Sequence, residues 1–149
     1  MATAYTAAYN KALAGSSFAP PFASGALTDT SANGVRDGVA YFASHDITYQ
    51  LSLQPAPGTW AFRARNGAAI VVGSLVQNLS WRSGPRDCVL QDPDRTNYGL
   101  SVSPGLYRTL QVQQVSHLLA LDSASSVRVV GFYTAELNAS TGTDQACSG

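Results

Sequence analysis

Charge is scarce in this sequence. Nine Lys and Arg residues balance nine Asp and Glu residues, and charged residues fill 12% of the 149 positions, about half the usual share. Lys11 is the one lysine and no basic run occurs, so the chain lacks the positive surface that binds nucleic acid or an anionic membrane. We therefore expect neither as a partner. Low charge also weakens repulsion between molecules, which suits a protein packed in an assembly.

Long apolar runs are also absent. None approaches the roughly 18 residues that span a bilayer, so we do not expect an integral membrane protein. The N-terminus has no basic region followed by an apolar core, so we expect no secretion signal. The sequence thus predicts a protein that stays in the compartment where it is made.

Cysteine is limited to Cys88 and Cys147, which are too few and too far apart for a zinc site of the paired kind. In a reducing compartment we expect two free thiols. The alternative is a disulfide that ties the C-terminal tail to the loop at residues 86–94. The sequence leaves both states open.

Catalytic side chains are few, with one Glu and two His in the whole chain. Neither His45 nor His117 belongs to a nucleophile motif, and the sequence has no Gly-x-Ser-x-Gly and no His-Glu-x-x-His. We expect His117 to be a strand-edge or core histidine. The sequence therefore predicts a protein that is not an enzyme and has no cofactor, although a site assembled from distant residues is the alternative.

Asp87, Asp92 and Asp94 form the one local concentration of carboxylates, and such oxygen ligands could hold Ca²⁺. Arg86 and Arg95 flank the cluster and neutralise it. A solvated loop with local ion pairs is the favoured interpretation, so we expect no metal. The three aspartates are kept as a weak calcium candidate.

Alternation of apolar and polar side chains is the clearest structural signal. It runs without exception from residue 47 to residue 53, which predicts a strand with one core face. Residues 59–65 and 68–73 predict a hairpin, because Asn66 and Gly67 suit a type I′ turn. Trp60, Trp81 and Tyr49 fall on apolar faces of such strands, so we expect them in the core.

Residues 98–137 contain four apolar runs separated by short polar turns. The runs at 117–121 and 127–133 are apolar on both sides, as expected of strands that are covered on both faces. With a sheet beginning near residues 39–42, the chain holds eight or nine short strands and at most one short helix. The predicted fold class is all-β, an antiparallel β-sandwich of jelly-roll kind, and a Greek-key barrel fits the strand count as well.

The first 34 residues predict an N-terminal arm. Residues 3–13 are rich in Ala and suit a short helix, while the prolines at 20 and 21 exclude an ordinary helix and predict an extended stretch. The arm either lies as a strap over its own domain or reaches a neighbouring subunit. The organisation is then an arm at 1–34, a sandwich at 35–137 and a flexible tail at 138–149. The candidate partner-binding residues are Tyr5, Tyr9, Phe18, Pro20, Pro21 and Phe22.

Three segments carry a resemblance to a known group of proteins. Residues 103–110 (SPGLYRTL), 115–121 (VSHLLAL) and 126–133 (SVRVVGFY) resemble the closing strands of small virion proteins from tailed phages, most of all head decoration or cement proteins. The resemblance implies a β-sandwich or barrel, often a trimer, that binds the capsid protein and itself through an N-terminal arm. It implies no catalytic residues.

The first hypothesis is therefore a non-enzymatic structural component of a phage-like virion, a capsid decoration or cement protein. Its partners would be the capsid protein and further copies of itself, as a homo-oligomer and most simply a trimer. It would be located in the virion, after assembly in the host cytoplasm. The alternative is a carbohydrate- or receptor-binding β-sandwich of a tail, spike or fibre, which would use exposed Tyr side chains and the loop at 82–97.

Overall fold

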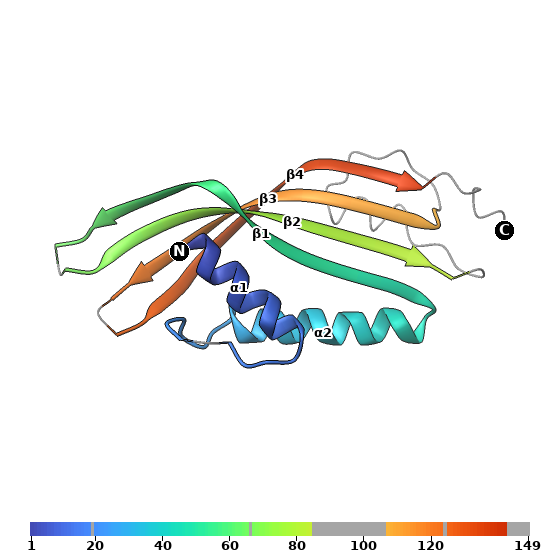
Figure 1. Cartoon of the computed structure of the whole chain (residues 1–149), viewed down its shortest axis with the longest axis horizontal. Helices are drawn as coiled ribbons and strands as arrows, with labels where there is room; N and C mark the ends of the chain where they lie inside the picture. Colours follow the sequence, from blue (N-terminus) through green and yellow to red (C-terminus); the bar gives the residue numbers. More distant parts are fainter. Residues whose placement is uncertain (19, 66, 85–106, 124, 143–149) are drawn as a thin grey trace. The chain divides into compact units, whose positions relative to one another are not determined.

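A computed structural model describes residues 1–18, 20–65, 67–84, 107–123 and 125–142, and these residues form two helices and four long strands (Figure 1). The protein is mostly β, with one antiparallel sheet in the order β1-β2-β3-β4. The elements are α1 (Ala2–Leu13), α2 (Asp29–Ser44), β1 (Ile47–Arg63), β2 (Ala69–Ser83), β3 (Thr109–Asp122) and β4 (Val127–Gly142).

The strands are 14 to 17 residues long, about three times the usual length. The separate strands predicted at 47–53 and 59–65 are parts of one strand, β1, and the return strand predicted at 68–73 belongs to a longer strand, β2. Pro55 and Pro57 do not end β1 because it is an edge strand, where a residue without an N–H breaks no ladder bond on the open side.

The pairing of β1 with β2 explains how these prolines fit. Ala64 donates its N–H to the Ala68 carbonyl at one end, and Gly84 donates to Asp46 at the other. Between these two hydrogen bonds β1 advances by 18 residues, from Asp46 to Ala64, whereas β2 advances by 16, from Ala68 to Gly84. The two additional residues require a bulge in β1, and the proline- and glycine-containing stretch at 55–58 is the natural place for it.

The chain divides into two compact units, which are described separately. Unit 1 comprises Met1–Arg36, Leu53–Val76 and Val115–Ala135, and unit 2 comprises Asp37–Ser52, Gln77–Gln114 and Glu136–Gly149. Each strand contributes residues to both units, as does α2.

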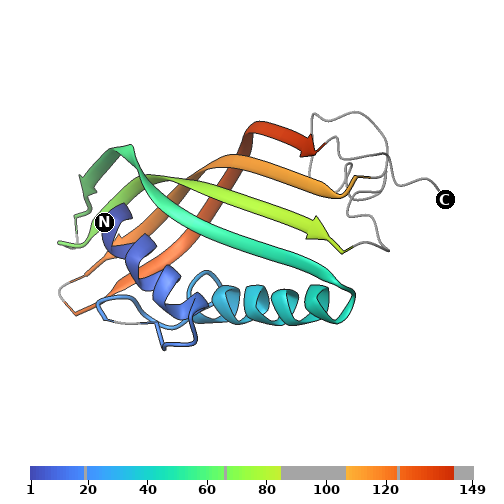
Figure 2. The same cartoon turned by 45° about the vertical axis from the view of Figure 1, so that its right-hand side comes forward.

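Helix α1 packs on one side of the unit 1 strands (Figure 2). The helix predicted at 3–13 is confirmed, and its buried residues recur every three to four positions: Ala2, Tyr5, Thr6, Ala8, Tyr9 and Ala12. Gly73 of β2 allows the close approach, because a Cβ there would lie 3.3 Å from the Ala2 Cβ. Small residues on both elements thus bring the helix onto the strands.

The second helix was not predicted. The expectation of an extended chain up to residue 34 is wrong from Asp29 onward, and the expected strand near 39–42 is helical. Gly34 and Gly38 lower the helix propensity of this segment, so its sequence does not indicate a helix. Its start is stabilised by Asp29, whose carboxylate lies in the first turn, where the helix dipole favours negative charge.

The core of unit 2 is built around Trp81, Leu110 and Val112. The Tyr49 ring stacks on Trp81 with a centroid distance of 5.1 Å. The predicted core position of Trp81 is confirmed, since its exposed fraction is 7%, whereas the prediction for Trp60 is wrong, because 53% of it is exposed.

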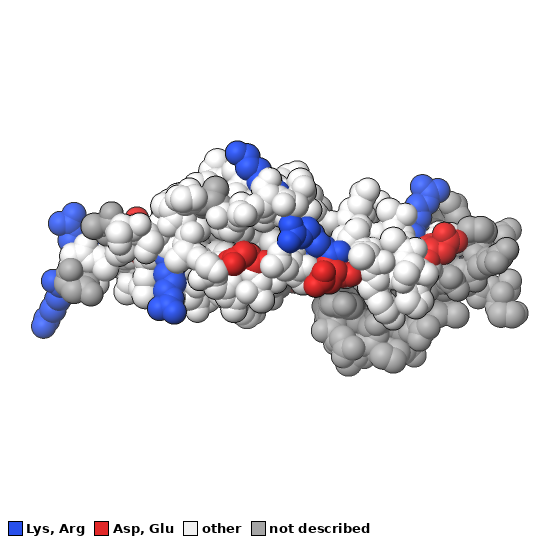
Figure 3. Space-filling model, turned by 90° about the horizontal axis from the view of Figure 1, so that it is seen from below, with Lys and Arg blue, Asp and Glu red and all other residues white. Residues whose placement is uncertain are grey.

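The surface reflects the composition. On the side shown in Figure 3, Lys, Arg, Asp and Glu side chains lie scattered, singly or in small groups, among uncharged residues. Much of the described surface on this side is therefore neutral.

Neighbouring leucines on β3 provide a test of this fold. Leu118 is fully buried on the helix side, so Leu118→Ala should lower the free energy of unfolding by about 2–5 kcal/mol. Leu119 points to the other side and is 37% exposed, so Leu119→Ala should lower it by about 1 kcal/mol or less. Urea unfolding at low protein concentration measures both. Equal losses would contradict the assignment of the two faces.

Candidate functional site

The candidate partner-binding aromatics of the N-terminal region lie inside unit 1. Tyr5, Tyr9, Phe18 and Phe22 form one cluster with ring centroids 5.6–6.0 Å apart. Tyr5, Tyr9 and Phe22 are buried and Phe18 is half-buried, whereas Pro20 and Pro21 are exposed. The arrangement is that of a strap over its own unit, one of the two alternatives left open by the sequence.

The two tyrosine hydroxyls in this cluster have partners. Tyr5 donates to the Leu27 carbonyl at 2.6 Å, and Tyr9 shares a hydrogen bond of 2.7 Å with the Ser31 hydroxyl. Burial, and after it the neighbouring Tyr9, raises the pKa of Tyr5; burial also raises the pKa of Tyr9, against a smaller lowering by Ser31. Both phenols are therefore neutral and structural.

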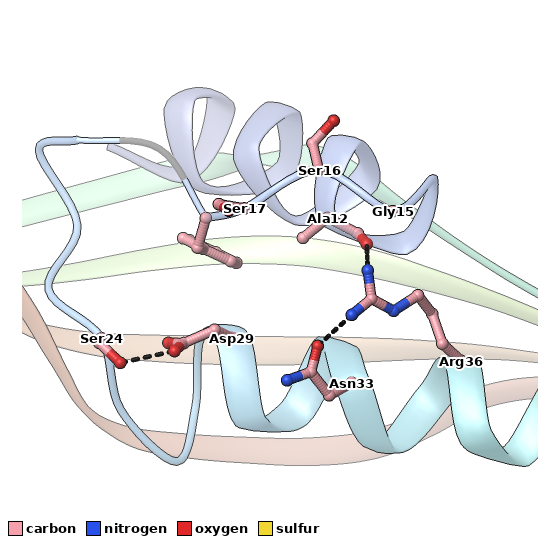
Figure 4. A pocket seen from close by; sticks show the side chains of 9 residues that line it. Ala12, Gly15, Ser16, Ser17, Ser24, Asp29, Asn33 and Arg36 are labelled. Atoms are coloured by element: carbon pink, nitrogen blue, oxygen red, sulfur yellow. Dashed lines mark hydrogen bonds between the residues drawn. The ribbon is translucent and has the colours of Figure 1, made fainter.

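A polar cavity of about 330 Å³ lies between the end of α1, the segment after it and the first turns of α2 (Figure 4). Arg36 donates to the Ala12 carbonyl at 3.1 Å and to the Asn33 side chain. It thereby caps the C-terminal end of α1, where a cation is favoured by the helix dipole. Its charge serves to hold two helical segments together.

Asp29 lines the same cavity and is also engaged. Its carboxylate accepts hydrogen bonds from the Ser24 hydroxyl, the Gly25 N–H and the Thr28 hydroxyl, and these bonds hold its pKa well below the usual range. The two charged side chains that line the cavity, Asp29 and Arg36, thus stabilise the start of α2 and the end of α1. The cavity is best explained as a polar seam inside unit 1.

The side of the unit 1 strands opposite α1, here called the outer face, differs from these buried sites. Gly73 faces α1, so its neighbour Ser74 points the other way, and Ser74 bonds to His117 of β3 at 3.1 Å. Gly131 of β4 lies beside Leu119 of β3, because a Cβ added at position 131 would be 3.3 Å from the Leu119 Cβ. His117, Leu119 and Gly131 therefore share the outer face.

The first strand extends the same face. The pairing of Ala64 with Ala68 places Phe62 opposite Ile70 and Trp60 opposite Val72. Because side chains alternate along a strand, Ile70 and Val72 lie on the Ser74 side of β2. The Trp60 ring lies along its own strand over Gly58, where a Cβ would come within 2.8 Å of it.

Large apolar side chains dominate the outer face. Phe62 is 61% exposed, Trp60 53% and Tyr133 68%, while Ile70, Leu119 and Leu121 are between 37% and 41% exposed. The outer-face positions are 60 and 62 on β1, 70, 72, 74 and 76 on β2, 115, 117, 119 and 121 on β3, and 129, 131, 133 and 135 on β4. None of these positions holds Asp, Glu, Lys or Arg. The described part of unit 1 thus has one helix-covered face and one uncovered apolar face.

The sequence contained a signal for this face that its interpretation missed. The runs at 117–121 and 127–133 are apolar on both sides, which is typical of strands covered twice. The predicted β-sandwich would cover the second side of these strands with another sheet of the same chain. In the described structure α1 covers one side of these strands in unit 1, and their second side is exposed.

The Ser74–His117 pair brings a hydroxyl and an imidazole together on the outer face. Nucleophilic catalysis also needs a group that orients the imidazole and donors that stabilise an oxyanion. The outer face offers no carboxylate for the first role, and the buried Ser74 is 4% exposed. The pair is therefore a cross-strand contact. His45 follows the end of α2 and lies beside the Tyr41 carbonyl and ring.

Some predicted sites lie outside the described residues, namely Asp87, Asp92, Asp94, Cys88 and Cys147. Among the described residues, no group of three or more His, Cys, Asp or Glu side chains could hold a metal ion. No helix within the described ranges is long and apolar enough to cross a membrane.

The chain matches no protein-family model, no curated protein and no solved structure.

Asp29 gives a pH-dependent prediction. Its pKa is lowered in the folded state, so its stabilising effect is present above about pH 4, the unfolded value, and is lost as the pH falls below it. Asp29→Ala should lower the melting temperature at pH 7, and the difference from the unsubstituted chain should shrink toward pH 2. Asp37→Ala is the matched control for the removal of a carboxylate from the middle of the same helix.

Proposed function

We propose that this chain is a non-enzymatic structural protein that joins a larger protein assembly through its outer face. The uncovered apolar outer face carries this proposal. Monomeric proteins rarely expose contiguous apolar patches of more than a few hundred Å², and larger patches mark interaction sites. Three exposed aromatics on one face of one sheet are typical of such a site.

The lack of charge supports contact with protein. The outer-face positions carry neither the basic residues that bind phosphate nor the acidic residues that bind cations. Rigid strands also present the aromatics at low entropic cost, because two-χ side chains on a sheet lose little freedom on binding. A rigid, neutral, apolar surface suits permanent contact in an assembly.

For the setting we propose a phage-like virion, in which the chain decorates or cements the capsid and binds both the shell and itself. The resemblance of residues 103–110, 115–121 and 126–133 to closing strands of head decoration proteins supports this setting. The predicted β-sandwich, of jelly-roll kind, would then be completed by a second sheet on the outer face. We assign the binding of partners to the outer face and not to the N-terminal arm, because Tyr5, Tyr9 and Phe22 of the arm are buried.

A carbohydrate- or receptor-binding module is the second candidate, because Trp60, Phe62 and Tyr133 could stack on sugar rings. Sugar recognition also needs several polar groups that converge beside the aromatics. The outer face offers chiefly Ser74 and His117, which are bonded to each other. This observation favours protein contact over sugar contact.

Fractionation of native material tests the proposed function. In a density gradient of lysate from cells that naturally produce the chain, an antibody should find it with particles of megadalton size. Recovery only in the slow fractions, together with a positive glycan array that depends on Trp60, would contradict the assembly role and favour the second candidate.

A further inference from the structure

We infer that the occupant of the outer face is a second copy of the same chain, packed sheet against sheet. The inference rests on the proposed function and adds the identity of the partner. It follows from the edges of the sheet, the area of the outer face and its charge.

The edges of the unit 1 sheet are blocked at two points. On β1 the Asn10 side chain acts like a neighbouring strand: its Nδ2 donates to the Leu53 carbonyl at 2.9 Å, and its Oδ1 accepts from the Leu53 N–H at 3.2 Å. On β4 the Val127 N–H donates to the Pro21 carbonyl at 2.8 Å, and the Val127 carbonyl accepts from Ala23 at 2.9 Å. Blocked edges disfavour association by an added strand.

The area of the outer face fits a dimer. A large aromatic side chain offers about 150–250 Å², so Trp60, Phe62 and Tyr133, which are 53%, 61% and 68% exposed, present roughly 270–450 Å² per copy. Two copies would bury about twice this area from aromatics alone. Ile70, Leu119 and Leu121 raise the total to about 1,000 Å², the size at which specific interfaces begin.

The charge of the outer face fits a copy of itself. A charged partner would leave its own charges unpaired on a surface that holds no Asp, Glu, Lys or Arg at its strand positions. An identical apolar face brings no such mismatch, and two sheets packed face to face at about 10 Å form the usual core of a sandwich. The second layer predicted for strands that are apolar on both sides would come from the partner copy.

Sedimentation velocity and light scattering of the purified full chain test the inference over a range of protein concentrations. The unsubstituted chain should be a dimer at about pH 8. Phe62→Lys and Leu119→Lys should each weaken dimerisation at least about tenfold. The matched control is Tyr41→Lys on α2, because Tyr41 and Phe62 are both 61% exposed, and it should leave the dimer unchanged. Circular dichroism melting confirms that each variant is folded.

A chain that is monomeric at every concentration, or a control that dissociates like Phe62→Lys, would overturn the inference. A monomer that still co-sediments with native particles would leave the proposed function standing with a different partner, so the two failures can be told apart.

Discussion

The packing of α1 on one side of the sheet is the interaction on which the rest of unit 1 depends. Tyr5 and Tyr9 bury their rings between the helix and the strap of residues 15–28, and their hydroxyls bond to Leu27 and Ser31. Asn10 ties the same helix to the edge of β1. Because these contacts hold the helix to one side, the other side of the strands is uncovered in the described part of unit 1.

That asymmetry links the fold to the proposed role. Strands that are apolar on both sides reach their lowest free energy when both faces are covered, since each exposed aromatic forfeits apolar burial. Among the described residues of unit 1, α1 supplies one cover and no element supplies the other. In the proposed role, the chain would gain stability when its outer face meets a complementary surface.

Charge plays a local part in this protein. Asp29 and Arg36 act at helix ends, where backbone dipoles favour them, and their surroundings are already satisfied by hydrogen bonds. The outer face, in contrast, has the hydrogen-bonded pair of Ser74 and His117 as its polar feature. In the proposed role, recognition of a partner would therefore depend on shape and apolar area.

The sequence by itself determined the mostly β character, the strand at 47–53 and the short helix at 3–13, because period-two and Ala-rich patterns act over a few neighbouring residues. It also indicated two-sided strands at 117–121 and 127–133. It did not predict α2, where Gly34 and Gly38 lower helix propensity and tertiary packing compensates. Nor could it show that Pro55 and Pro57 sit in an edge strand, since strand order is a property of distant pairings.

Only the tertiary structure decided which residues of the candidate site are hidden and which are free. Phe22 and Trp60 are both large aromatics in apolar surroundings along the chain, yet one is 7% exposed and the other 53%. A local pattern reveals that a side chain is apolar and which of two faces it shares with its neighbours. The cover for each face comes from residues far away in sequence, and here α1 covers one face only.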